Sequence, residues 1–131
     1  MGIKEEAVAL HNKGFNCAQA VLCACCKYTG LDESIALSIA GGMGGGVRCG
    51  EICGAVSGAV MALGLITPYN NSEDTDAKAR IADDTREFVA KFKEQFGCVR
   101  CLELKAKGIS CNQLIGEAAE ITEKMILDRR K

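Results

Sequence analysis

The sequence predicts an all-α protein in which residues 1–131 form a single domain, a compact bundle of about five to six helices. Apolar residues recur with the helical period along most of the chain, and no run alternates cleanly as a half-buried strand would. Aromatic residues make up only 5% of the chain, so a residue class that favours strands is scarce. A chain of 131 residues is long enough to bury a hydrophobic core without help from disulfides or metals.

The N-terminal part of the chain is expected to begin with a helix over residues 3–13. A second helix should run from Cys17 to about residue 28, because Asn16 and Gln19 have the spacing of a capping box. An aspartate then caps a short helix over about residues 32–40.

The central part is expected to contain a glycine-rich loop over residues 41–46 and a helix of small residues over about 51–65. The charged stretch over about 73–95 predicts one long amphipathic helix. The stripe of that helix that faces the core should consist of Ala77, Ile81, Thr85, Phe88, Val89, Phe92 and Phe96.

The C-terminal part is expected to hold a short helix over 101–107, and Ser110 with Gln113 repeats the capping-box pattern before a final helix to about residue 128. Cys17 and Cys111 therefore each follow an N-cap directly. Unpaired N–H groups and the helix dipole favour negative charge there, which lowers a thiol pKa and favours the thiolate that binds metals. Both cysteines also face inward, so the alternative is that they are ordinary core cysteines.

Charge and hydropathy argue against nucleic-acid and membrane partners. The formal net charge is -1 and the sequence pI is about 5.9, which gives no basic surface for nucleic acid or anionic lipid. The first residues lack the apolar core of a signal peptide, and the uncharged stretch over 52–72 is too interrupted to span a bilayer. We therefore expect a cytoplasmic protein without membrane insertion.

Nine cysteines are the most unusual feature of the composition. An odd count cannot pair completely, and a reducing cytoplasm disfavours a structural disulfide framework. His11 is the only histidine, which excludes His-rich zinc sites and Rieske-type ligation. We expect His11 to lie on a solvated helix, and any metal site to be all, or nearly all, thiolate.

Cys53 lies within a run of small residues. Glycine recurs every four residues, at Gly46, Gly50, Gly54 and Gly58. In a helix these glycines would form a smooth ridge that lets another helix or a cofactor approach closely, and tight helix packing alone fits the spacing equally well. Cys49, one helical turn before Cys53, is a candidate spare thiol.

Two CxxC spacings occur. Cys98 and Cys101 follow a helix-breaking glycine, and this spacing is shared by redox dithiols, zinc sites and iron–sulfur sites. The CxxC spacing leaves open whether Cys98 or Cys101 is a ligand. The second spacing, in Cys23-Ala24-Cys25-Cys26, is expected in mid-helix. Cys25 should face the core and its two neighbours should point away from Cys17, which favours a structural role for all three.

Several blocks resemble a known family. They are Gly14-Phe15-Asn16-Cys17-Ala18-Gln19-Ala20-Val21-Leu22, Gly44-Gly45-Gly46, Cys53-Gly54-Ala55-Val56-Ser57-Gly58-Ala59, Met61-Ala62-Leu63-Gly64-Leu65, Phe96-Gly97 with Cys101, and Cys111 with Leu114-Ile115. In this order they resemble the C_GCAxxG_C_C family of redox-active proteins over nearly the whole chain. The family is similar to the cluster-bearing part of split-Soret cytochromes. The resemblance implies a [2Fe-2S]-type iron–sulfur centre, without haem, on Cys17, Cys53, Cys101 and Cys111.

The leading hypothesis is accordingly a redox-active electron-transfer protein with an all-cysteine iron–sulfur site and an unidentified redox partner protein. Four thiolates equally suit zinc, so a zinc-binding structural or interaction module is the first alternative. A metal-free thiol–disulfide oxidoreductase or sensor, using Cys98 with Cys101 or Cys53 with another thiol, is the second. The sequence does not decide whether the protein is an enzyme, and it leaves a homodimer open.

Overall fold

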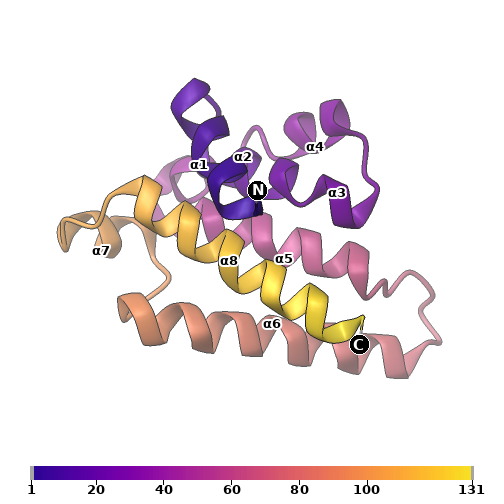
Figure 1. Ribbon diagram of the computed structural model, residues 1–131. Helices are drawn as coiled ribbons and strands as arrows, with labels where there is room; N and C mark the ends of the chain where they lie inside the picture. The colour runs from indigo at the N-terminus through magenta and orange to yellow at the C-terminus, as the bar shows by residue number, and fades with distance from the viewer. Residues whose placement is uncertain (1, 131) are drawn as a thin grey trace.

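The computed structural model describes residues 2–130 and is helical throughout (Figure 1). The helices are α1 (Ile3–Lys13), α2 (Cys17–Ala24), α3 (Cys26–Thr29), α4 (Glu33–Ile39), α5 (Gly54–Ile66), α6 (Thr75–Phe96), α7 (Cys101–Ala106) and α8 (Cys111–Arg129). An irregular helical turn, η1 (Gly46–Gly50), precedes α5. The all-α prediction is confirmed. Between residues 2 and 130 there is no strand beyond one isolated bridge, and no helix is both long and apolar enough to cross a membrane.

The helices are more numerous than the five to six predicted, and one reason is a break in the second expected helix. At Cys25 the backbone N–H is shared between the carbonyls of Val21 and Leu22, at 3.2 Å each, and φ and ψ are -79° and -7°. The chain therefore changes direction and starts α3 at Cys26. No glycine or proline marks this break, so the residue pattern gave no sign of it.

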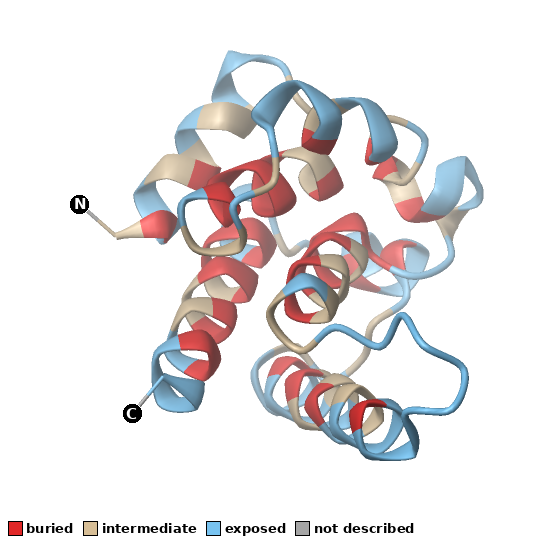
Figure 2. Cartoon of the chain, turned by 90° about the vertical axis from the view of Figure 1, so that its right-hand side faces the viewer, coloured by how far each residue is buried: buried red, intermediate tan, exposed pale blue. Residues whose placement is uncertain are grey.

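Helix α5 lies between α2, α6 and α8, and α1 packs against α2 and α8 (Figure 1). Buried residues line the faces that these helices turn toward one another (Figure 2). The largest fully buried side chains include Phe88, Phe92, Leu22, Leu63, Ile115 and Met125. Residues from the N-terminal and C-terminal parts of the chain thus form one core. This packing brings together the starts of helices that are far apart in the sequence.

The close approach of α5 to α2 depends on glycine. A Cβ at Gly58 would lie 2.7 Å from the carbonyl oxygen of Ala18, and one at Gly54 would lie 2.9 Å from the sulfur of Cys17. The predicted contact of these two glycines with another helix is confirmed. The prediction that all four glycines form one helical ridge is wrong, because Gly46 and Gly50 lie outside α5 with φ of 65° and 77°.

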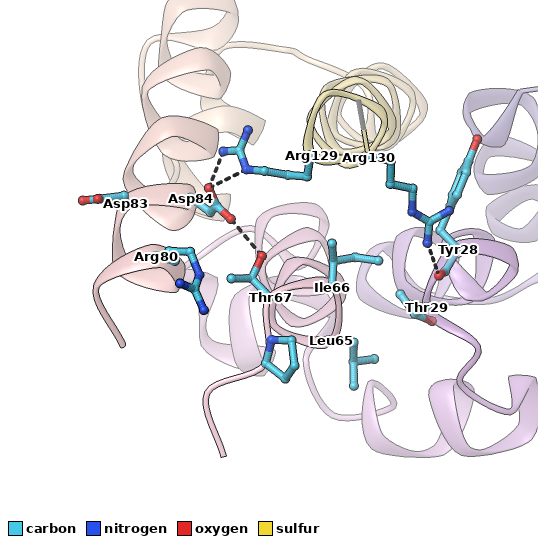
Figure 3. Close-up of a pocket in the computed structure, with 11 residues that line it drawn as sticks. Tyr28, Thr29, Leu65, Ile66, Thr67, Arg80, Asp83, Asp84, Arg129 and Arg130 are labelled. Atoms are coloured by element: carbon cyan, nitrogen blue, oxygen red, sulfur yellow. Dashed lines mark hydrogen bonds and ion pairs between the residues drawn. The ribbon is translucent and has the colours of Figure 1, made fainter. Parts of the chain in front are cut away.

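Helix α6 buries the expected stripe, with Ala77, Phe88 and Phe92 inside, and it also buries Asp84, which the pattern missed. The Asp84 carboxylate accepts hydrogen bonds from Thr67 Oγ1 at 3.1 Å and Arg129 Nε at 3.1 Å, and Arg129 Nη2 makes a further contact (Figure 3). These partners offset the cost of burying a charge. Thr67, Asp84 and Arg129 line an open pocket of about 690 Å³. The pocket is at the opposite end of the molecule from α7, and no cysteine lines it.

Candidate functional site

Four cysteines that are far apart in the sequence line one small cavity. Its lining consists of Cys17, Cys53, Cys101, Cys111, Gly45, Lys105 and Leu114, and its volume is about 40 Å³. The structure thus brings together all four residues that the family resemblance singles out. We call these four residues the cavity cysteines.

Each cavity cysteine lies at the beginning of a helix. Cys17, Cys101 and Cys111 are the first residues of α2, α7 and α8, and Cys53 is the N-cap of α5. The first turn of a helix has N–H groups without helical partners and a partial positive charge. The cavity is therefore surrounded by four helix starts, a setting that favours a negatively charged group.

Capping boxes fix two of these helix starts, as predicted. The Asn16 side chain accepts a hydrogen bond from the Gln19 backbone N–H at 2.9 Å, and Gln19 Oε1 accepts one from the Asn16 N–H at 2.9 Å. The corresponding distances between Ser110 and Gln113 are 3.2 and 3.1 Å. Each box sets the direction of the first turn and hence the position of the cysteine that follows.

A short antiparallel backbone pairing holds the other two cysteines side by side. The N–H of Cys53 donates to the carbonyl of Val99 at 2.8 Å, and the N–H of Cys101 donates to the carbonyl of Glu51 at 2.6 Å. Arg100 and Glu51 add an ion pair at 2.8 Å on the exposed side. No local pattern in the sequence marks this pairing, because its two segments lie almost fifty residues apart.

The glycine-rich loop passes directly over the site. A Cβ at Gly44 would lie 2.5 Å from that of Asn16, and a Cβ at Gly46 would lie 2.4 Å from the Glu51 nitrogen and 2.9 Å from the Cys101 Cβ. Only glycine allows these approaches. Val47 and Arg48 then adopt φ of 58° and 61°, a conformation that is rare for residues other than glycine and costs free energy for a β-branched one.

At Cys53 and Cys111, burial shifts the thiol pKa more than the helix ends do. Burial raises the pKa of Cys53 to about 12, although hydrogen bonds from the Ala55 and Val56 backbone oppose it. Burial also raises the pKa of Cys111. The nearby Cys17 raises it further by a smaller amount, and Lys105 lowers it. The expectation that a helix start lowers the pKa of the Cys111 thiol is therefore wrong, because desolvation outweighs it. Metal binding would itself displace these protons.

The remaining sequence candidates lie outside the cavity. Cys98 is half-buried and does not line it, so of the CxxC pair only Cys101 does. Cys49 is exposed and donates to the Gly46 carbonyl at 3.4 Å. Its expected helical spacing from Cys53 is wrong, since the intervening backbone is not helical. His11 is on α1, where Nδ1 lies 2.9 Å from Asn112 Oδ1 at the start of α8.

The other three cysteines, Cys23, Cys25 and Cys26, meet at the junction of α2 and α3, and we call them the junction cysteines. None lines the cavity. Cys25 is fully buried, as predicted. Cys23 and Cys26 are only 5% and 8% exposed, so they are covered by protein rather than by solvent. Burial raises the pKa of Cys23 to about 11 and that of Cys25 to about 12.

The donor chemistry of the cavity suits a thiolate-bound metal centre. Four cysteine sulfurs are the ligand set of [2Fe-2S] and [4Fe-4S] clusters and of structural zinc. Within residues 2–130, however, no group of three or more His, Cys, Asp or Glu side chains is arranged to hold a single metal ion.

The chain is thus all-helical, and four of its helix starts present cysteines to one cavity. A family model described as "Putative redox-active protein (C_GCAxxG_C_C)" matches residues 15–125, a range that includes all four cavity cysteines. The chain belongs to this C_GCAxxG_C_C family. No curated protein and no solved structure matches it.

Proposed function

We propose that the protein transfers electrons through a [2Fe-2S]-type iron–sulfur cluster bound by Cys17, Cys53, Cys101 and Cys111. The observation that carries this proposal is the meeting of four thiols, from four helix starts, around one cavity. When bound, such a cluster supplies one-electron redox chemistry.

The surroundings of the cavity fit the charge of that centre. A cluster with four thiolate ligands is anionic, and the helix starts direct N–H groups and partial positive charge toward it. Lys105 adds a cation to the lining, and Leu114 adds an apolar side chain that excludes water. The protein's part in the reaction is thus to hold the sulfurs, offset their charge and limit solvent access.

Four cysteine ligands suit structural zinc as well as a [2Fe-2S] cluster. The family model, described as that of a redox-active protein, supports a redox centre over a structural zinc ion.

The unpaired thiols of the cysteines support our proposal that the protein is cytoplasmic. All nine lie within the described residues, and none forms a disulfide. Free thiols in this number fit a reducing compartment such as the cytoplasm. The partner would be another redox protein, which supplies or accepts the electron.

Anaerobic purification followed by metal and sulfide analysis tests the proposal. We expect a brown protein with sulfur-to-iron charge-transfer absorption, and iron and acid-labile sulfide in equal amounts, two of each per chain. A colourless protein loaded with zinc would replace the proposal with the zinc-binding module. A metal-free protein that cycles between thiols and a disulfide of cavity cysteines would replace it with a thiol–disulfide oxidoreductase.

A further inference from the structure

We propose that Cys23 and Cys26 form a second redox site, a dithiol that reduces low-molecular-weight disulfides such as glutathione disulfide and is oxidised to an intrachain disulfide. The site is separate from the cavity. It lies at the junction of α2 and α3 beside α4, whereas α7, which begins with the cavity residue Cys101, lies at the other end of the molecule (Figure 1).

The two thiols are placed to form a bond. Cys23 is in the last turn of α2 and Cys26 opens α3, so they stand three residues apart across the break at Cys25. Side chains at that spacing on a helix face each other with Cβ atoms about 5–6 Å apart, and a small adjustment brings them to disulfide geometry. In this cluster the Cys23 thiol donates to Glu33 Oε2 at 3.8 Å, and the Cys26 thiol donates to the Leu22 carbonyl at 3.7 Å. Cys25, between them, is directed into the core and is fully buried.

The two thiols have different surroundings, which assigns them different roles. Cys26 is the more exposed of the pair, at 8% against 5%. Burial and then the nearby Glu33 carboxylate raise the pKa of Cys26, while contacts with Cys23 and Thr29 act in the opposite direction. Cys23 instead has its sulfur 3.8 Å from Oε2 of Glu33 on α4. Cys26 is therefore the attacking thiol, and Cys23 is the resolving thiol with a carboxylate beside it that accepts its proton.

The reaction proceeds in two exchanges. The Cys26 thiolate attacks one sulfur of glutathione disulfide, so that a mixed disulfide forms and one glutathione leaves as thiolate. Cys23 then gives its proton to Glu33 and attacks the Cys26 sulfur, which forms the Cys23–Cys26 disulfide and releases the second glutathione. Two electrons pass from the protein dithiol to glutathione disulfide. The proton that Cys26 loses to solvent and the proton that Cys23 loses through Glu33 balance the two leaving thiolates, which become glutathione thiols.

The surroundings of the pair favour this chemistry over metal binding. The sulfur of Cys26 lies 3.7 Å from the Leu22 carbonyl oxygen, so this pair faces oxygen acceptors, namely a carbonyl and a carboxylate. The pair also offers two thiols, which is fewer than the four cysteine ligands of iron–sulfur and structural zinc sites.

The test is oxidation of the full-length, folded protein by glutathione disulfide under anaerobic conditions. Remaining thiols are blocked after a series of times, and tandem mass spectrometry reads the tryptic peptide over residues 14–27, which contains Cys17 and the junction cysteines. We expect a Cys23–Cys26 disulfide in the wild type, in Cys25→Ala and in Cys17→Ser. Its formation in Cys17→Ser would show that the dithiol does not depend on the cavity or on a metal there.

Three variants assign the roles. Cys23→Ala should stop with glutathione on Cys26, whereas Cys26→Ala should leave Cys23 as a thiol. Glu33→Gln should form the same disulfide at least about tenfold more slowly, with glutathionylated Cys26 accumulating first, because the resolving thiol has lost its base. An equal rate in Glu33→Gln would remove Glu33 from the proposal.

Cys25 provides an internal control that needs no variant. Because it is fully buried, it reacts only when the chain opens. Glutathionylation of Cys25 at the same rate as Cys26 would mean that unfolding exposes all three thiols, which would overturn the proposal. Wild-type protein that keeps Cys23 and Cys26 as thiols in excess glutathione disulfide would overturn it as well.

Discussion

The cavity cysteines and the junction cysteines are the same residue type in opposite electrostatic settings. Those of the cavity stand at helix starts, where backbone N–H groups face the sulfurs, and Lys105 lies among them. At the junction the sulfurs meet oxygen atoms instead, the Leu22 carbonyl and the Glu33 carboxylate. Burial raises the pKa of Cys53 and Cys111 in the cavity and of all three junction cysteines. The comparison therefore shows that the two groups differ in the polar groups around their sulfurs and not in the direction of these pKa shifts.

The largest effect should come from removing a cavity thiol. Serine has a similar shape but is a poor ligand for soft metals, so Cys17→Ser and Cys111→Ser should abolish or greatly weaken metal binding. Cys23→Ser and Cys26→Ser should keep it. The measurement is bound iron per chain after anaerobic reconstitution with iron and sulfide. Equal losses of bound iron in Cys17→Ser and Cys23→Ser would contradict the distinction between the cavity cysteines and the junction cysteines.

A large loss of stability should follow Gly58→Leu, which forces α5 away from α2 close to Cys17. The new side chain would meet the Ala18 backbone, where even a Cβ lies only 2.7 Å from the carbonyl oxygen. Overpacking of this kind costs roughly 1–3 kcal/mol or more. Denaturant unfolding measures the change in the free energy of unfolding.

Gly64→Ala is the matched control within the same helix. A Cβ at this position has no neighbour within 4 Å, so alanine should stabilise α5 by up to about 1 kcal/mol. An unchanged melting temperature and unchanged iron content in Gly58→Leu would contradict the role assigned to the α2–α5 contact.

At the junction, Cys25→Ser should affect folding more than metal content. It places a hydroxyl in the core, where an unsatisfied polar group costs about 1–3 kcal/mol. Cys49→Ser makes the same change at an exposed position and should stay within about 0.5 kcal/mol of the wild type. Calorimetry on both variants gives the comparison, and a Cys25→Ser protein that loses iron while keeping its stability would argue against it. Cys23 and Cys26 point away from Cys17 in the predicted helix, which favoured nearly silent serine variants, but both are buried, so these variants should lose some stability.

The smallest effect should be electrostatic. Reduction adds negative charge to the centre, so replacing the cation in Lys105→Gln should lower its reduction potential, on the order of tens of millivolts. Redox titration of the reconstituted protein measures this shift. Lys78→Gln, on α6 and outside the cavity lining, is the control and should leave the potential unchanged. Equal potentials in the two variants would place Lys105 too far from the metal to matter.

Local signals predicted the parts of the site that depend on neighbours in sequence. The pairs Asn16 with Gln19 and Ser110 with Gln113 gave the starts of α2 and α8 to the residue, because a capping box needs only a few side chains. The first helix, Ile3–Lys13, also has the predicted bounds.

The parts of the site that could not be predicted from local sequence depend on contacts between residues far apart in the chain. The pairing of Ile52 with Arg100 joins segments that no periodicity relates, and it decides that Cys101 lines the cavity and Cys98 does not. The family resemblance supplied the set of four cysteines, since local reasoning had singled out only Cys17 and Cys111. The left-handed turn at Val47 runs against the conformational preference of a β-branched residue, so local propensity did not predict it.

The bridge between Ile52 and Arg100 also has a consequence for the order of events during biosynthesis. The ribosome releases the N-terminal segments well before the partner segment around Arg100 and the start of α8 exist. A nascent chain that ends before Cys111 holds at most three of the four sulfurs, and closing the long loop carries an entropic cost that only the completed pairing and core repay. The cavity is therefore a late product of folding, and the proposed metal centre can be inserted only after Cys111 and the start of α8 have been synthesised.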